Sequence, residues 1–434
     1  MLGVGSGSRG HWPRVLVAWH CHPDTMEPDR QTEPLANNQH LLGAVKARAT
    51  DLHPQLLAWR HHLHENPELS FEEHQTVAFV AAELNKMGLV PTPVANTGLV
   101  VLIEGRNKDK HTVALRADMD ALPITEANDV PYKSKNIGVM HACGHDVHTT
   151  SLLGAATILH GLRDQFEGTI KLLFQPGEER TPGGASMMIR DGALQSPAPA
   201  SIVGQHVMPL LPVGKVGFRS GMYMASADEL YVTVHGKGGH GAMPEQFIDP
   251  VLMASHMVVA LQQVVSRMAN PRIPSVLSFG KVIANGATNV IPNSVYLEGT
   301  FRTMDEPWRA EALVKMKKLA EGLVESMGGR CDFDIHHGYP YLMNDPDLTA
   351  RMRSWAVDYM GADNVVDLDL WMAAEDFAYY AQEIPGCFYR LGTRNEAKGI
   401  VSGVHTPTFD IDEDALPTGA GLIAWLALQE LRLS

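Results

Sequence analysis

The amino-acid sequence predicts an α/β protein whose mainly parallel sheet is interrupted by a smaller inserted domain. Two observations carry this prediction: apolar strand-like runs alternate with helical segments, and this alternation stops near Ala225 and resumes after Asp345. In the first part, strands and helices are expected in turn over residues 99–104, 113–116, 149–162, 170–174 and 184–192. Because βαβ units build parallel sheets that helices cover on both faces, the parts before and after the interruption are expected to share one sheet.

The interrupting segment has its own order of elements, β-α-β-β-α-β. We expect these elements over residues 229–234, 250–267, 275–283, 294–302, 307–327 and 331–336. This is the ferredoxin-like α+β arrangement, and a segment of about 110 residues is long enough for a core of its own. We therefore expect a catalytic, metal-binding domain made of residues 46–224 and 338–434, with residues 225–337 inserted as a lid or dimerisation domain that hinges at both crossings.

The flanking segments complete the prediction. Further helices and strands are expected over residues 41–65, 71–87, 347–360, 387–392 and 416–431. Three histidines near the end of the first helix, His61, His62 and His64, are expected on the surface. Residues 1–45 begin with a Gly- and Ser-rich stretch and are expected to form a disordered extension, because their apolar run, residues 15–19, is too short for a secretory signal.

Composition excludes several classes of function. The chain has 434 residues, too many for one ordinary core, and a formal net charge of −14, which argues against nucleic-acid binding. Its four cysteines lack the spacing of a disulfide framework, which fits a cytoplasmic protein. No segment reaches 18 consecutive apolar residues, so no membrane span is expected.

Potential metal ligands gather just after the predicted strands. Cys143-Gly144-His145 leads into a helix, and Glu178-Glu179 follows the apolar run 170–174. His206 follows another apolar run, and His405 lies in Gly403-Val404-His405. Binding sites of parallel sheets form at the carboxyl ends of the strands, so these side chains are expected to meet. A structural zinc site would be closed and rich in Cys-x-x-Cys pairs, whereas this mixed donor set predicts a reactive divalent-metal site.

The number of donors indicates two ions. The five candidates are Cys143, His145, Glu179, His206 and His405. Five ligands are too many for one catalytic ion with an open position, and two ions with three ligands each must share one. A thiolate or a carboxylate can bridge, so Cys143 is the first candidate and Glu179 the alternative. A hydroxide shared by the ions would act as the nucleophile, Glu178 would accept its proton and pass it to the leaving amine, and Asp118 would hold an imidazole tautomer behind the ligands.

The chain resembles the M20 metallopeptidase and amidohydrolase family, in particular the N-acyl-amino-acid amidohydrolases that include hippurate and auxin-conjugate hydrolases. The motifs that carry the resemblance are Leu115-Arg-Ala-Asp-Met-Asp-Ala-Leu122, Met140-His-Ala-Cys-Gly-His-Asp-Val-His148, Phe174-Gln-Pro-Gly-Glu-Glu179, Gly238-Gly-His-Gly-Ala-Met-Pro244, Ala374-Glu-Asp-Phe377 and Gly403-Val-His405. Other M20 branches have His-x-Asp where this chain has Arg116-Ala-Asp118, a difference that favours an amidohydrolase over a dipeptidase and leaves the ligand role to His145.

The resemblance implies a dinuclear site with the same five ligands and Glu178 as the general base. It also implies that His240 stabilises the oxyanion, often in the site of a partner subunit across a dimer of the inserted domains. Asn289 and Arg302 match the positions that hold the substrate carboxylate, for which a guanidinium is suited. Structural interpretations stay open for both: a turn asparagine and a strand-end surface arginine. Glu375-Asp376 could contact substrate or balance a helix dipole.

The sequence therefore predicts a metal-dependent hydrolase that cleaves the amide bond of N-acyl or N-aroyl L-amino acids, as a homodimer or higher homo-oligomer. A carboxypeptidase or aminopeptidase acting on short peptides is the alternative within catalysis. A non-catalytic metal-binding protein is the alternative outside it, and the intact Glu178 argues against it. Two ions of Zn²⁺ or Mn²⁺ are expected, and Co²⁺ or Ni²⁺ also suit the mixed ligands.

Overall fold

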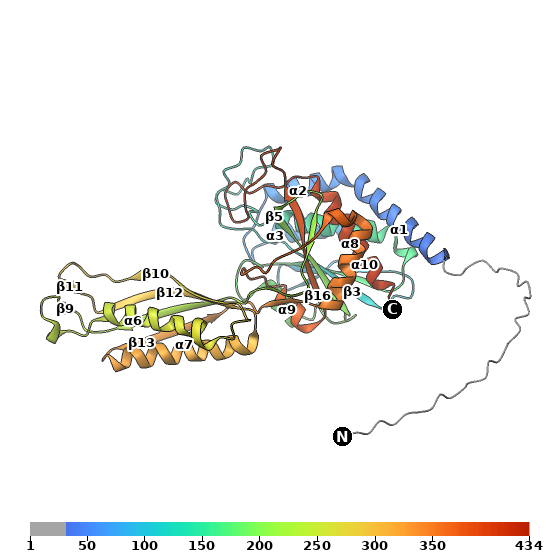
Figure 1. The fold of residues 1–434 in the computed structure, drawn as a ribbon. Coiled ribbons are helices and arrows are strands. Elements are labelled where there is room, and N and C mark those ends of the chain that lie inside the picture. Colours follow the sequence, from blue (N-terminus) through green and yellow to red (C-terminus); the bar gives the residue numbers. More distant parts are fainter. Residues whose placement is uncertain (1–31, 434) are drawn as a thin grey trace, which may run out of the picture. The chain divides into compact units, whose positions relative to one another are not determined.

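The computed structural model describes residues 32–433 of the chain (Figure 1). Residues 1–31 of the expected disordered extension lie outside the described residues, and for residues 32–45 the expectation is wrong, because they are helical. The single helix expected over residues 41–65 is wrong, because the structure has two helices, α1 (Thr32–Asp51) and α2 (His53–Glu65). Pro54 explains the break: it lacks a backbone N–H and is favoured only in the first turn of a helix. Helix α3 (His74–Lys86) follows within the expected range.

The larger sheet has eight strands in the order β1-β2-β4-β3-β5-β16-β6-β15. Their bounds are β1 Thr92–Val94, β2 Gly98–Glu104, β3 Thr112–Asp118, β4 Thr169–Gln175, β5 Ser201–Pro212, β6 Val216–Phe218, β15 Val365–Asp367 and β16 Gly386–Arg394. The four central strands, β4, β3, β5 and β16, run parallel, whereas β2 and β6 run antiparallel to their central neighbours. All residues of β3 and β4 are buried, as expected for strands covered on both faces.

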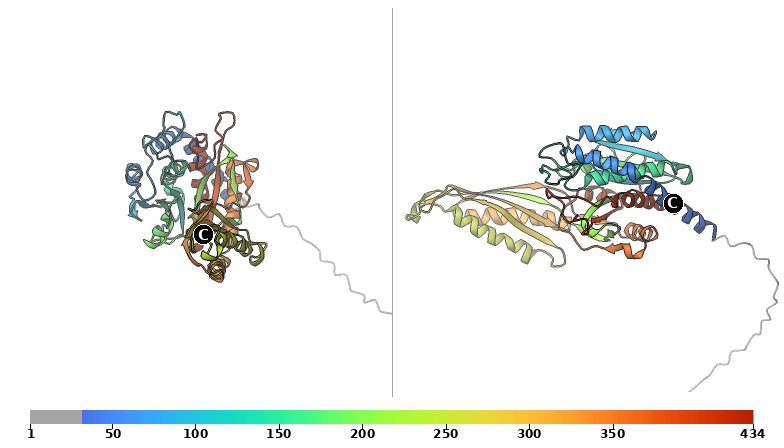
Figure 2. Two further views of the ribbon diagram at one scale, coloured as in Figure 1. Left: turned by 90° about the vertical axis from the view of Figure 1, so that its left-hand side faces the viewer. Right: turned by 90° about the horizontal axis from the view of Figure 1, so that it is seen from above.

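Helices cover both faces of this sheet (Figure 2). Neighbouring residues of β5 show the two sides, because Gly204 faces Phe377 at the start of α9 (Ala378–Glu383) and Gln205 faces Gly419 of α10 (Ala415–Leu431). Helix α4 (His145–His160) packs against α10 and β3, and α8 (Pro346–Met360) also packs against α10. On the other face, α5 (Gly184–Arg190) packs with α9. A small ribbon pairs β7 (Gly221–Met224) with β14 (Leu342–Asn344).

The inserted segment forms a second, antiparallel sheet in the order β10-β12-β8-β13. Its elements are β8 Asp228–His235, α6 Pro250–Gln263, β10 Ser275–Ile283, β12 Ser294–Thr303, α7 Glu306–Ser326 and β13 Arg330–His337, which is the predicted β-α-β-β-α-β order. Asp249 and Asp305 cap the two helices, each followed by proline in the first turn. Apolar residues of both helices and of the sheet form a separate core, which includes Val232, Met257 and Met316.

A short ribbon extends this small sheet. Its strands, β9 (Gly239–His240) and β11 (Val290–Ile291), lie at the end of the small sheet opposite the chain crossings near residues 226 and 339 (Figure 1). Residues 250–268, helix α6 with its last turn, form one helix that is long and apolar enough to cross a membrane by length and composition, with a mean hydropathy of 1.2. The sequence analysis predicted this helix over residues 250–267, and its residues Met253, Met257 and Leu261 pack in the core of the small sheet.

Candidate metal centre

The five predicted ligands come from four segments at one end of the larger sheet, with Cys143 and His145 in one turn. His145 starts α4, Glu178 and Glu179 follow β4, and His405 lies in the loop before α10. The sequence placed His206 after a strand ending near Gly204, but β5 continues to Pro212 and His206 is inside it, paired in register with Arg390 of β16. The helix expected from Thr149 also begins earlier, so that His145 is in its first turn.

The turn that presents Cys143 and His145 requires glycine. Gly144 has φ +82°, and a Cβ atom there would lie 2.5 Å from Cγ2 of Val207 on β5. A side chain at this position would therefore strain the backbone and push β5 away from α4. His405 is held in a similar way: its own φ is +60°, and its N–H donates to the carbonyl of Ala142 at 2.7 Å. Strained backbone of this kind concentrates at functional sites.

We expect Gly144→Ala to lower the free energy of unfolding by at least about 2 kcal/mol, because backbone strain and overlap with Val207 act together. Gly214→Ala is the matched control, since Gly214 has φ +83° but open space around its Cβ position. Urea unfolding of both variants measures the difference. An equal loss in the two variants would show that contact with β5 does not matter.

Short distances join four of the five candidate ligands, Cys143, Glu179, His206 and His405. The Cys143 sulfur lies 3.4 Å from Nε2 of His206 and 3.3 Å from Nε2 of His405. His405 Nε2 is also 3.1 Å from Oε1 of Glu179. Two groups of donor atoms, each within 4.8 Å of one another, contain Cys143: one with His145 and His206, and one with Glu179 and His405. The structure thus brings all five predicted ligands together, and Cys143 is the member that the two groups share.

The two buried histidines have lone pairs directed at this centre. His145 Nδ1 donates to Oδ1 of Asp120 at 3.2 Å, and His206 Nδ1 donates to the carbonyl of Val207 at 2.7 Å. These bonds fix the tautomer in which Nε2 is free to bind a metal ion. Nε2 of His145 is buried without a hydrogen-bond partner, and Oε1 of Glu179 has only the ion-pair contact with His405, as is expected of donors that bind a metal ion. The donor set therefore fits divalent cations.

Electrostatics supports the same conclusion. Burial lowers the pKa of His145, but the carboxylates of Asp118 and Asp120 outweigh it and raise this pKa to about 10. Burial, together with the charge of Glu179, raises the pKa of the Cys143 thiol well above its usual range. Both shifts favour the protonated forms of these donors, and a metal ion binds only the deprotonated forms. Bound cations would displace these protons and produce the thiolate.

Cys143→Ala is expected to lose at least one of two equivalents of bound metal, because it removes the donor that both groups share. Cys331→Ala, in the core of the small sheet, is the control and should keep the metal content of the unaltered protein. Elemental analysis of dialysed protein gives the stoichiometry. Two retained equivalents in Cys143→Ala would exclude a bridging thiolate.

Glu178 belongs to two groups, and in the first of these its donor atom lies within 4.8 Å of those of His145 and Glu179. Its carboxylate lies with those of Glu375 and Asp376 in a buried group and is 4.0 Å from Nε2 of His145. Burial, followed by the charges of Glu375 and Glu179, raises the pKa of Glu178 well above its usual range. Its carbonyl accepts a hydrogen bond of 2.5 Å from the Tyr339 hydroxyl, which lies in the second crossing between the two sheets.

The roles left open for Glu375 and Asp376 now have a structural answer. Both are buried and pair with Arg116, at 3.0 and 2.8 Å. Asp376 also accepts from the N–H of Ala185 at the start of α5, so it balances a helix N-terminus. Burial raises its pKa to about 8. These two carboxylates bind the guanidinium of Arg116 and lie within 4.8 Å of the Glu178 carboxylate. Because both are buried, neither is an open substrate contact.

Asp118 holds an imidazole as predicted, but that imidazole belongs to His148 rather than to a predicted ligand. Its Oδ1 accepts from His148 Nδ1 at 2.6 Å. The carboxylate behind a candidate ligand is Asp120, which accepts from His145 and from the N–H groups of Glu178 and Glu179, both at 3.0 Å. Sequence reasoning missed Asp120, although two aspartates two residues apart at the end of a buried strand were a usable signal.

The predicted substrate residues are not at the centre within this chain. His240 and Asn289 lie together on the β9–β11 ribbon, where the N–H of Gly241 donates to the Asn289 carbonyl at 2.9 Å. Arg302 lies at the other end of β12, beside the crossing, and its Nη1 is buried without a hydrogen-bond partner. Ser294 and Arg302 are separated by about 27 Å of strand at ~3.4 Å per residue.

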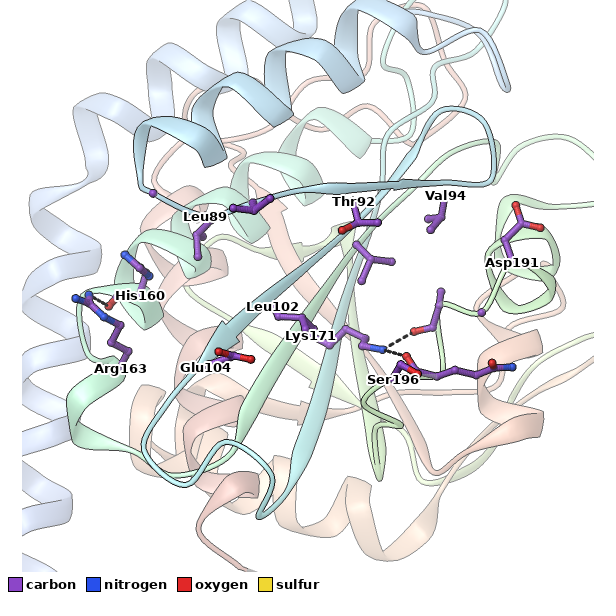
Figure 3. Close-up of a pocket in the computed structure, with 16 residues that line it drawn as sticks. Leu89, Thr92, Val94, Leu102, Glu104, His160, Arg163, Lys171, Asp191 and Ser196 are labelled. Atoms are coloured by element: carbon purple, nitrogen blue, oxygen red, sulfur yellow. Dashed lines mark hydrogen bonds between the residues drawn. The ribbon is translucent and has the colours of Figure 1, made fainter.

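A cavity of about 620 Å³ lies elsewhere, over β1, β2 and β4 (Figure 3). Its lining includes Lys171, whose Nζ donates to the carbonyls of Ala193 and Gln195 at 3.0 and 2.5 Å. None of the five candidate ligands lines it. This cavity is therefore separate from the metal centre.

Known proteins share this sequence and fold. The sequence pattern of peptidase family M20/M25/M40 matches residues 114–429. N-acetyl-L-cysteine deacetylase of Bacillus subtilis is 41% identical over 366 residues, which are 84% of this chain and 85% of that protein. IAA-amino acid hydrolase ILR1-like 4 of Arabidopsis thaliana is 38% identical over 394 residues, 89% of this chain and 88% of the relative. A crystal structure of the Bacillus subtilis YXEP protein, described as a dinuclear metal-binding peptidase of the M20 family, superposes with a TM-score of 0.76 at 34% identity and covers 88% of this chain and 99% of that one.

Proposed function

Since the chain belongs to peptidase family M20/M25/M40, a family of metal-dependent hydrolases, we propose that it hydrolyses the amide bond of N-acyl or N-aroyl L-amino acids. The products are a carboxylic acid and a free amino acid. The observation that carries this proposal is the pair of donor groups that share Cys143, with Glu178 beside them. Relatives named for deacetylation of N-acetyl-L-cysteine and hydrolysis of IAA-amino acids support the substrate class.

Two divalent ions would be held by Cys143, His145, Glu179, His206 and His405. Bound there, such ions lower the pKa of water toward neutrality and polarise a carbonyl group. Asp120 orients His145 and both glutamate N–H groups, which keeps ligand and base at a fixed separation. His405, whose side chain is 52% exposed, marks the side from which substrate enters.

Glu178 is the proposed general base. It is not needed as a ligand, its side chain is only 8% exposed, and burial raises its pKa, which makes the carboxylate a stronger base than an exposed glutamate. Glu178 takes the proton of the attacking water and then delivers it to the nitrogen of the leaving amine, which must be protonated to depart. A purely metal-storing protein would have no use for this free carboxylate, so the non-catalytic alternative is disfavoured.

We further propose that the active site is completed by a second copy of the chain. One small substrate does not reach both Arg302 and Asn289 within a chain, because they are at opposite ends of β12. If His240 and Asn289 serve the partner's centre, Arg302 and Asn289 can hold one substrate carboxylate from two subunits. His240, exposed on its ribbon, would then stabilise the oxyanion.

The small sheet has a surface suited to such a dimer. Strand β10 is an edge strand of the small sheet, and it exposes Val276, Val282 and Ile283. The neighbouring helix α6 exposes Val251, Leu252 and Val259. Exposed apolar side chains beside an unpaired strand edge favour association. This supports residues 225–337 as the dimerisation domain.

The substrate class is tested by supplying purified protein with Zn²⁺, Mn²⁺, Co²⁺ or Ni²⁺ and a panel of N-acyl amino acids and dipeptides. We expect amino-acid release from the N-acyl compounds to exceed that from dipeptides. Faster cleavage of dipeptides than of every N-acyl compound would support the short-peptide alternative. No cleavage with any of the metals would refute the proposed function.

A further inference from the structure

Another cavity, of about 500 Å³, has an apolar lining that includes residues close in sequence to two candidate ligands, His206 and His405. We call it the apolar pocket; its main walls are Met208, Leu211, Tyr223, Leu368, Trp371 and Val404. Its volume is within the range of about 300–1,000 Å³ that is usual for small-molecule sites.

Two residues of the lining are close in sequence to candidate ligands. Met208 follows His206 by two residues on β5, so both side chains leave the same face of the sheet. Val404 immediately precedes His405 in the loop before α10. We therefore infer that a group bound in the apolar pocket lies next to His405, on the exposed side of the metal centre.

The aromatic walls are fixed by a buried arginine. Arg390, the register partner of His206, is fully buried, and its guanidinium lies 4.7 Å from the ring centre of Trp371. Its Nε donates to the Tyr223 hydroxyl at 2.6 Å. The two aromatic side chains are thus held in place by one charged group, as in a preformed pocket.

The lining also restricts the charge of an occupant. Among the described residues that line the apolar pocket, none is lysine, arginine or histidine, and the charged members are Asp367 and Asp369. Asp367 is exposed and pairs with Arg353 at 2.8 Å outside the pocket. Arg390 lies behind the ring of Trp371 and is not part of the lining, so an anionic group would lose its hydration without a direct basic partner, whereas a neutral apolar group would gain by burial.

We propose that the apolar pocket binds the acyl group of the substrate and selects neutral, bulky acyl groups, either aromatic or alkyl chains of several carbons, over acetyl and over anionic groups such as succinyl. This inference rests on the proposed function. The orientation follows from the fold: Arg302, the proposed carboxylate anchor, is in the inserted domain, whereas the apolar pocket is built on the larger sheet. The amino-acid part therefore points to the insertion and the acyl part to the larger sheet.

The test compares kcat/KM for N-acetyl-, N-succinyl-, N-octanoyl- and N-benzoyl-L-alanine, which differ only in the acyl group. We expect N-octanoyl and N-benzoyl substrates to exceed the N-acetyl substrate by at least about tenfold. Trp371→Ala should lower the benzoyl-to-acetyl ratio by at least about tenfold, and Leu370→Ala, at the rim of the apolar pocket, by a smaller factor. Leu102→Ala, in the cavity of Figure 3, is the control and should leave this ratio unchanged.

A second series keeps the benzoyl group and changes the amino acid from alanine to leucine and phenylalanine. If Trp371→Ala changes the ranking of amino acids instead of acyl groups, the assignment is wrong. It is equally wrong if N-succinyl substrate is preferred, or if the benzoyl-to-acetyl ratio is the same in all variants. In each of these cases the hydrolase function would still stand.

Binding to the metal-free protein separates the two proposals. Neutral N-benzyl benzamide added to chelator-treated protein should change tryptophan fluorescence in a saturable way, and Trp371→Phe should abolish the change. If no N-acyl substrate is hydrolysed but this binding persists, the proposed function fails while the apolar pocket keeps its preference. Absence of the fluorescence change in the unaltered protein would refute the preformed pocket.

Discussion

Replacing Glu178 by glutamine is expected to reduce kcat by a factor of about 10³ to 10⁴ while both metal ions stay bound. Glutamine has nearly the same shape as glutamate but accepts no proton, so the attacking water and the leaving amine lose their proton carrier. Glu178 is not a member of either group that shares Cys143, and glutamine keeps its size beside His145 and Glu179, so the metal content should not change. Steady-state kinetics and elemental analysis of the same sample measure both quantities.

Glu167→Gln is the matched control, since Glu167 is exposed and pairs with Lys110 at 3.0 Å on the surface. It should keep the activity of the unaltered protein. Glu179→Gln should behave differently from both, because it removes a proposed ligand and hence metal. Loss of metal from Glu178→Gln, or a rate within tenfold of the unaltered protein, would remove Glu178 from its proposed role.

Mixing two inactive variants is expected to restore activity if each site is built from two subunits. His240→Ala alone should lower kcat about 10²–10³-fold, the usual effect of removing an oxyanion donor. In a heterodimer with Glu178→Gln, one site combines an intact Glu178 with an intact His240. Random exchange in a two-fold dimer should therefore recover about a quarter of full activity.

The control for this experiment replaces His240→Ala in the mixture by His336→Ala, on the exposed face of β13, where it pairs with Asp334. That variant should be fully active before mixing. Activity of the His240→Ala and Glu178→Gln mixture that equals the mean of the separate variants would contradict a shared site. Metal loss in His240→Ala would contradict the oxyanion role.

Much of the fold could be predicted because its signals are local. The strands around Ile170 and Val113 are short apolar runs, and the insertion shows its periodicity element by element. The donors of the metal centre were found for the same reason, because Cys143, His145 and Glu179 lie next to strand or helix ends. Each of these inferences needs only a few neighbouring residues and the rule that sites form at the ends of parallel strands.

What the sequence did not reveal depends on contacts between distant segments. His64 was expected on the surface, but it is buried and its Nδ1 lies 2.8 Å from Oδ2 of Asp146 in the first turn of α4. The choice between Asp118 and Asp120 depends on which one faces His145, and the Ser70 hydroxyl, from a loop before α3, also donates to Asp120 at 2.6 Å. The anchoring of Trp371 by Arg390 likewise joins two strands and a loop that no local pattern connects.

The central claim is that two cations share the sulfur of Cys143. Anomalous diffraction from crystals grown with zinc or manganese tests it most directly. Two anomalous peaks are expected, one near His145 and His206 and the other near Glu179 and His405, with the Cys143 sulfur in contact with both. A single peak, or peaks that leave Cys143 outside the coordination of either ion, would contradict the account.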